Sequence, residues 1–139
     1  MEPHEISHRD RVYIDEGVMD IYRSLTDGSN KEQSPFSTYK DVFLFAACIG
    51  FHNGRRKKLP VGAKNTIRLD VFRDEGIGLI KALAIATTGD VIILTKPSDF
   101  LEIAEEYANS GIHDVKSDLL DERGHPLWNL VNLLGEHEA

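Results

Sequence analysis

Residues 38–50 read TYKDVFLFAACIG, and residues 51–60 continue as FHNGRRKKLP. The first segment is almost wholly apolar, with the hydroxyl of Ser37 or Thr38 placed to cap a helix and Asp41 in its first turn. Apolar side chains all round a helix indicate that it lies at the centre of the fold. The second segment holds four consecutive cations between a glycine and a proline: Arg55, Arg56, Lys57 and Lys58. We therefore expect a buried helix that ends at Gly50 and presents a basic loop outward.

Charge is unevenly distributed along the 139-residue chain, whose net charge is −7. Residues 1–98 hold 14 Lys and Arg against 13 Asp and Glu, whereas residues 99–139 hold 2 against 10. Within the first part, residues 52–73 have a balance of +6, because they add Lys64, Arg68 and Arg73 to the four loop cations and contain one acid. This distribution is compatible with an anionic partner, with a head-to-tail homodimer, or with neutralisation by the acidic C-terminal third.

The composition is typical of one globular domain that needs no covalent or metal stabilisation. A chain of this length can bury roughly two thirds of its unfolded surface. We expect residues 10–135 to form the domain, between a flexible N-terminus at 1–9 and a tail at 136–139. The single cysteine, Cys48, excludes an intramolecular disulfide and is typical of a reducing compartment. With no signal-like apolar core near the N-terminus and no run of about 18 apolar residues, we expect a cytoplasmic protein without membrane contact.

Periodicity predicts an α-dominated α+β fold with five or six helices and two or three short strands. Residues 11–14 alternate as a short strand, and residues 66–72 alternate as a strand or an extended arm. Other helices are expected where apolar residues recur at helical spacing: 15–25, 74–87, 97–108, 112–120 and 127–134. The sequence Asn-Ser-Gly at 109–111 is expected to end one of them, and Trp128 is expected in the core. Residues 91–94 fit either a buried strand or a helix stub.

No catalytic motif is found in the chain, such as a glycine-flanked serine turn or a phosphate-binding loop. Asp118, Asp121 and Glu122, with His113 and His125 nearby, have metal-binding chemistry, but a solvated acidic face is favoured because their spacing fits no ligand pattern. The pairs Glu102/Glu106 and Glu105/Asn109 are interpreted as solvated for the same reason. We therefore expect no catalytic residue, metal or cofactor. A metal-dependent nuclease or hydrolase that uses the three carboxylates ranks last among the hypotheses.

Residues 36–59, FSTYKDVFLFAACIGFHNGRRKKL, resemble a family of small proteins called dnd (DNA phosphorothioation) system-associated protein 4. The segments at 11–14 and 91–120 resemble the family too, so the similarity spans most of the chain. The resemblance implies a bacterial role in defence against foreign DNA. That role is linked to phosphorothioation, in which sulfur replaces a backbone phosphate oxygen, or to its restriction machinery. The family supplies no catalytic residues.

The order strand, helix, helix, basic turn is also loosely similar to ribbon–helix–helix proteins. In those proteins a strand pairs across a dimer and its side chains enter the major groove of DNA. Arg11 and Tyr13 would be the outward strand residues in this chain. A long loop between the helices and a long C-terminal extension depart from that pattern.

The sequence leads to a hypothesis of a non-catalytic accessory protein that contacts the backbone of double-stranded DNA. Cations neutralise phosphates irrespective of base sequence, so we assign the contacts to basic residues. These residues are Arg55, Arg56, Lys57 and Lys58, helped by Lys64 and Arg68. The alternative is a protein-interaction adaptor that docks to a DNA-handling partner, such as another dnd-system protein, through the acidic residues 99–139.

Overall fold

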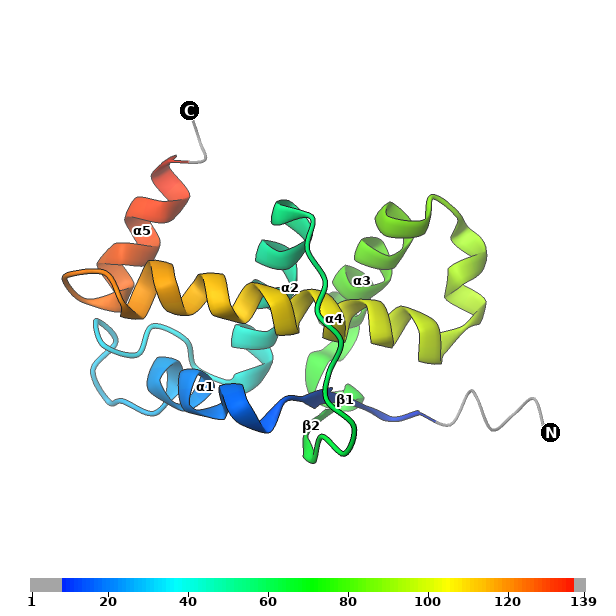
Figure 1. The fold of residues 1–139 in the computed structure, drawn as a ribbon, viewed down its shortest axis with the longest axis horizontal. Coiled ribbons are helices and arrows are strands. Elements are labelled where there is room, and N and C mark those ends of the chain that lie inside the picture. The colour runs from blue at the N-terminus through cyan, green and yellow to red at the C-terminus, as the bar shows by residue number, and fades with distance from the viewer. Residues whose placement is uncertain (1–8, 137–139) are drawn as a thin grey trace.

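The core is arranged around the crossing of two helices, α2 (Tyr39–Asn53) and α4 (Pro97–Val115). Figure 1 shows this crossing in the computed structural model, which describes residues 9–136. Helix α2 is the apolar helix expected from the sequence, and Thr38 caps it by accepting a hydrogen bond from the amide of Asp41. It continues beyond the expected end at Gly50. It stops at Gly54, whose backbone is left-handed (φ 67°), as is common for a glycine at this position.

Two glycines allow the backbones of α2 and α4 to touch. A Cβ atom on Gly50 would lie 2.1 Å from the carbonyl oxygen of Tyr107, and one on Gly111 would lie 1.9 Å from that of Ala46. This contact explains why the prediction of a helix end at residues 109–111 was wrong. Gly111 lies inside α4 because the crossing leaves no room for a side chain, and the helix runs on into a π-helical turn, η4 (Lys116–Leu120).

The two predicted strands are present and pair with each other. Strand β1 (Arg11–Ile14) is antiparallel to β2 (Asn65–Arg68), with Val12 opposite Ile67. Both of these side chains are buried, so the inner face of the ribbon packs on the core.

The second strand is shorter than expected, because residues 69–72 begin helix α3 (Leu69–Thr88). The helical turn buries Phe72 against Phe43, with ring centroids 5.6 Å apart. Arg73 then interrupts the helix with φ 58° and ψ −175°, a backbone conformation that residues other than glycine rarely adopt. The helix start predicted at Asp74 therefore corresponds to the second part of α3.

The short N-terminal helices follow the predicted pattern. Asp15 caps the 3-10 helix η2 (Glu16–Val18), which leads into α1 (Met19–Thr26). The predicted helical face of this region is buried: Val18, Ile21, Tyr22 and Leu25.

The segment at 91–94 forms part of a 3-10 helix, η3 (Val91–Thr95), so the buried-strand alternative is wrong. Only one of its apolar residues, Ile93, is buried. The last helix, α5 (Pro126–Glu136), packs against η4 near one end of the molecule (Figure 1). Trp128 is 51 % exposed, so the prediction that it anchors the core was wrong. Leu130 and Leu133 are the residues of α5 that pack against the core, and both are partly buried.

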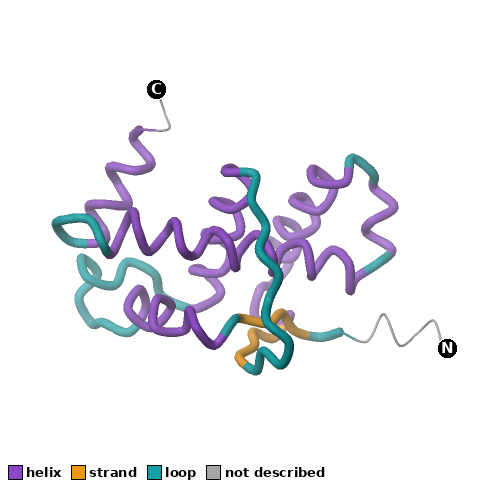
Figure 2. Tube along the Cα trace, viewed as in Figure 1, coloured by secondary structure: helices purple, strands orange, loops and turns teal. Residues whose placement is uncertain are grey.

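Helices dominate the described residues, and the sheet has two strands (Figure 2), which confirms the α-dominated α+β class. Among residues 9–136, no helix combines the length and the apolar character that a membrane crossing requires. The expected flexible N-terminus at 1–9 and tail at 136–139 lie outside the described residues, apart from Arg9 and Glu136.

Candidate nucleic-acid interface

Four of the six candidate basic residues lie on an extended segment, residues 55–60, that we call the strap. It crosses over α4 on its way from α2 to β2 (Figure 1). The amide of Lys57 donates a hydrogen bond to the carbonyl oxygen of Glu106 (3.0 Å). The Nδ2 atom of Asn109 donates to the carbonyl oxygens of Lys57 and Lys58, each at 3.2 Å. The loop is therefore held against α4 by its main chain. We had expected it to project outward from the end of α2, and it does not.

Arg56 anchors the strap to α4. Its Nε and Nη2 atoms lie 3.0 and 2.9 Å from Oε1 of Glu106. Its guanidinium carbon lies 5.7 Å from the centroid of the Tyr107 ring, within reach of a cation–π interaction. The side chain of Glu106 is 9 % exposed, so the prediction of a solvated carboxylate was wrong. This carboxylate is buried because Arg56 neutralises it.

Arg55 is engaged more weakly. Its Nη2 atom lies 3.5 Å from Oδ2 of Asp114, which also accepts a hydrogen bond from Asn53 at 2.9 Å. The Arg55 side chain is 65 % exposed. An ion pair so accessible to water contributes between about 0 and 1 kcal/mol. A guanidinium group has five N–H donors, so Arg55 keeps donors for a phosphate while it contacts Asp114.

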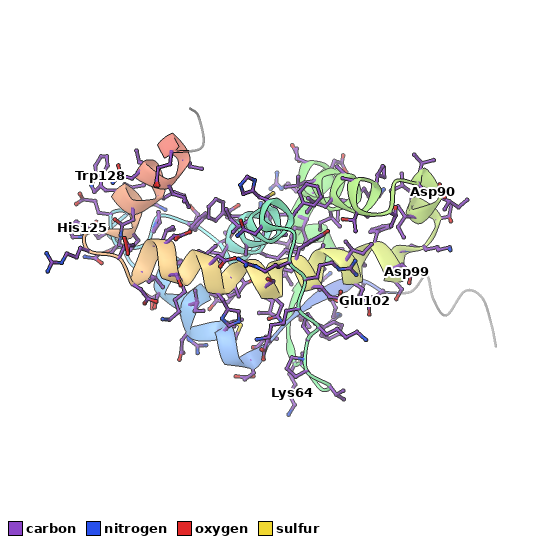
Figure 3. The ribbon with its side chains drawn as sticks, turned by 45° about the horizontal axis from the view of Figure 1, so that its top comes forward. Lys64, Asp90, Asp99, Glu102, His125 and Trp128 are labelled. Atoms are coloured by element: carbon purple, nitrogen blue, oxygen red, sulfur yellow. The ribbon has the colours of Figure 1, made fainter. Side chains whose placement is uncertain are left out.

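The lysines are the accessible charges of the strap. Lys57, Lys58 and Lys64 are exposed and form no ion pair with another residue in the range 9–136. Figure 3 shows Lys64 at the end of the loop that leads into β2, away from the body of the protein. Arg68 lies in β2 and contacts Asp70 at 3.0 Å, with both side chains about two-thirds exposed. The six candidate residues therefore extend along the strap and onto the ribbon, and they do not form a single cluster.

The outer face of the ribbon carries the strand residues that the sequence indicated. Tyr13 is exposed and Arg11 is partly exposed, whereas their neighbours on β1 are buried. β1 pairs with β2 of the same chain, whereas in ribbon–helix–helix proteins the strand pairs across a dimer. The register places Arg11 directly opposite Arg68. Each of these arginines contacts an adjacent aspartate, Asp10 or Asp70, which offsets the repulsion between them.

Glu105 is a second buried carboxylate of α4 that the sequence analysis expected to be solvated. It is 6 % exposed and accepts hydrogen bonds from the guanidinium of Arg9 and from the amide of Tyr13. Burial raises the pKa of the Glu105 carboxyl, and Arg9 and the Tyr13 amide offset this rise only in part. A signal was present in the sequence, since Glu105 shares a helical face with Leu101 and Ile112.

The remaining chemical candidates gain no support from the structure. Within residues 9–136, no three His, Cys, Asp or Glu side chains are grouped closely enough to hold a metal ion. Asp121 is instead paired with Lys116, whose Nζ atom lies 2.9 Å from the carboxylate. Cys48 is half-buried in α2, and burial raises the pKa of its thiol, which is the opposite of what a reactive cysteine needs.

A family model described as DNA sulphur modification system-associated protein 4 matches residues 11–138 of the chain. The matched range runs from β1 through α5 and includes both the strap and the helix that holds it. No curated protein and no solved structure matches the chain. The family resemblance in the sequence is therefore confirmed, whereas the DNA contacts of the six basic residues stay predictions.

Proposed function

Because the chain belongs to the family of DNA sulphur modification system-associated protein 4, we propose that it is a non-catalytic accessory protein of a bacterial phosphorothioation-linked defence system that contacts DNA. One observation carries the DNA contact: Lys57 and Lys58 are exposed on a strap whose main chain is fixed by Asn109 and Glu106. A loop that is already ordered loses little conformational entropy on binding. The ammonium groups of these two lysines then neutralise backbone phosphates without reading bases.

The six basic residues divide between two roles in this proposal. Arg56 is a positioning residue, because its guanidinium is taken up by Glu106 and Tyr107. Lys57 and Lys58 contact phosphates directly. Arg55, Lys64 and Arg68 extend the contact along the same loop and onto β2, where their side chains are exposed.

The test measures binding of the purified protein to plain and to sulfur-modified duplexes over a salt series. A slope of log affinity against log salt of about −0.9 per neutralised phosphate counts the contacts. In the double variant Lys57→Glu with Lys58→Glu, we expect affinity to fall by roughly 100-fold and the slope to become shallower by about two contacts.

A matched control separates local contact from overall charge. The pair Lys31→Glu with Lys96→Glu changes the net charge by the same amount at exposed positions outside the strap. We expect it to keep most of the affinity and the full slope. Equal losses in the two double variants, or no loss in either, would show that the strap does not bind DNA.

A protein-interaction adaptor is the second function that we propose, and a different observation favours it. The molecule exposes apolar side chains that a monomeric protein usually covers, including Val91 and Ile92 in η3 and Trp128, Val131 and Leu134 in α5. In this role the protein brings a DNA-handling partner of the system to the DNA that the strap holds.

A further inference from the structure

Helix α5 leaves an apolar face uncovered. Trp128, Val131 and Leu134 are 51, 47 and 50 % exposed. Residues three apart lie on one side of a helix, so these three side chains form a continuous stripe along α5. Leu127 is partly exposed and is related to Val131 and Leu134 by helical spacings of i+4 and i+7. This set of spacings is the one by which an amphipathic helix inserts its anchors into a groove of another protein.

Hydrogen bonds fix helix α5 to the rest of the protein. The amide of Leu127 donates to the carbonyl oxygen of Glu32 (3.0 Å), and Nε1 of Trp128 donates to the carboxylate of the same residue (2.7 Å). The Nδ2 atom of Asn129 donates to the carbonyl oxygen of Leu119 (3.0 Å). The Trp128 ring is therefore held in place at the exposed end of the molecule (Figure 3), which reduces the entropy lost when it is buried in an interface.

An acidic cleft lies beside the apolar stripe. Its volume is about 360 Å³, and it is formed between η4 and α5 by Asp118, Glu122, Asn129, Asn132, Leu133 and Glu136. At 100° per residue, Asn132 and Glu136 lie on the side of α5 next to Trp128. Carboxylates and amide oxygens accept hydrogen bonds, so the cleft is complementary to a lysine or arginine side chain.

We propose that α5 docks into an apolar groove on another protein of the same DNA sulphur modification system, and that a lysine or arginine beside that groove enters the acidic cleft. The inference rests on the adaptor function proposed above and assigns it to one surface. A second copy of this chain is disfavoured as the occupant. A two-fold contact between two α5 helices would bring their acidic clefts close together, and like charges across an interface weaken association.

The experiment measures binding of the full-length protein to each purified protein encoded with it in the modification system. We expect one of them to bind with a dissociation constant of about 10 μM or tighter. Trp128→Ala should weaken this complex roughly tenfold or more, because an aromatic anchor is lost. Val131→Glu should abolish it, and Glu122→Lys should weaken it and reduce its dependence on salt.

Two controls keep the outcome specific. Val71→Glu places the same charge on a comparably exposed valine in α3 and should leave the complex intact. The double variant Lys57→Glu with Lys58→Glu should lose DNA but keep the partner, so failure of the DNA proposal and failure of this one are distinguishable. Circular dichroism and thermal melting confirm that each variant is folded.

Three outcomes would overturn the inference. In the first, no protein of the system binds. In the second, a partner binds equally well to the α5 variants and to the unmodified chain. In the third, sedimentation shows a homodimer that dissociates on Val131→Glu, which would identify a second copy as the occupant.

Discussion

The strap and helix α5 contradict the sequence-based expectations in opposite directions. Four consecutive cations were expected to be free, yet Arg56 is held by a buried glutamate of α4 and Arg55 is paired with an aspartate. A leucine-rich helix around Trp128 was expected to be buried, yet half of that side chain is exposed. The comparison shows that the charge or hydropathy of a segment indicates the kind of group that it can contact. Its exposure depends on which distant segments pack against it.

The largest effect should follow from disturbing the crossing that supports the strap. Gly111→Ala places a Cβ atom 1.9 Å from the carbonyl oxygen of Ala46, so the two helices must separate. We expect a loss of at least about 3 kcal/mol in the free energy of unfolding, measured by urea denaturation. Gly78→Ala is the control, because no atom lies within 4 Å of the added Cβ. It should stabilise the protein by up to about 1 kcal/mol. Similar values for both variants would mean that the close contact does not exist.

A smaller effect should follow from releasing the strap itself. Asn109→Ala removes the hydrogen bonds to the carbonyl oxygens of Lys57 and Lys58. We expect a loss of about 2 kcal/mol in unfolding free energy and faster amide exchange in residues 55–60, measured by hydrogen exchange. Asn132→Ala, at an exposed position of α5, should change stability by less than about 0.5 kcal/mol. Unchanged exchange in the strap would show that α4 does not hold it.

In helix α5, the test is whether an apolar side chain contributes little to stability. Trp128→Ala should reduce the free energy of unfolding by about 1 kcal/mol, because half of the ring is already in water. Leu101→Ala in α4, at a side chain with 0 % exposure, should lose about 2–5 kcal/mol in the same denaturation experiment. If Trp128→Ala loses as much as the α4 variant, α5 belongs to the core and the comparison between the two regions fails.

The smallest effect concerns the buried carboxylate beneath the N-terminal strand. The pKa of Glu105 is raised above its ordinary value of 4.5, so the folded state binds its proton more readily than the unfolded state does. Stability contributed by this group is present below pH 4.5 and is lost as the pH rises through the raised pKa. Glu105→Gln stays uncharged. The unmodified protein should therefore lose stability relative to the variant as the pH rises above 4.5. Urea midpoints measure this difference, and a constant gap would contradict the assignment.

The elements that the sequence predicted well are those whose signals are local. The cap at Thr38, the alternation at residues 11–14 and the apolar face of α1 depend on neighbours within one turn or one strand, and all three are confirmed. The candidate basic residues were chosen by their type, and their DNA contacts stay a prediction. Their attachment to α4 was not predicted, because it depends on Glu106 and Asn109, about 50 positions away along the chain.

The wrong predictions share a physical cause, which is contact between distant segments. Gly111 has the composition of a helix end, but the backbone of α2 requires glycine at that place in the interior of α4. Glu105 and Glu106 each belong to an i, i+4 polar pair that indicated a solvated face, but arginines from two other segments neutralise them. Phe72 alternates as a strand residue would, but a helical turn brings its ring to Phe43. Local periodicity contains no information about these partners.

The glycine pair at the centre of the molecule also provides a criterion for finding homologues. Any polypeptide that keeps this arrangement must have glycine at the positions equivalent to Gly50 and Gly111, since even a methyl group at either would collide with a carbonyl oxygen. Arg-Arg-Lys-Lys is a common tetrapeptide and will recur by chance in unrelated genomes. Requiring both glycines alongside it would separate true members of the lineage from accidental similarity.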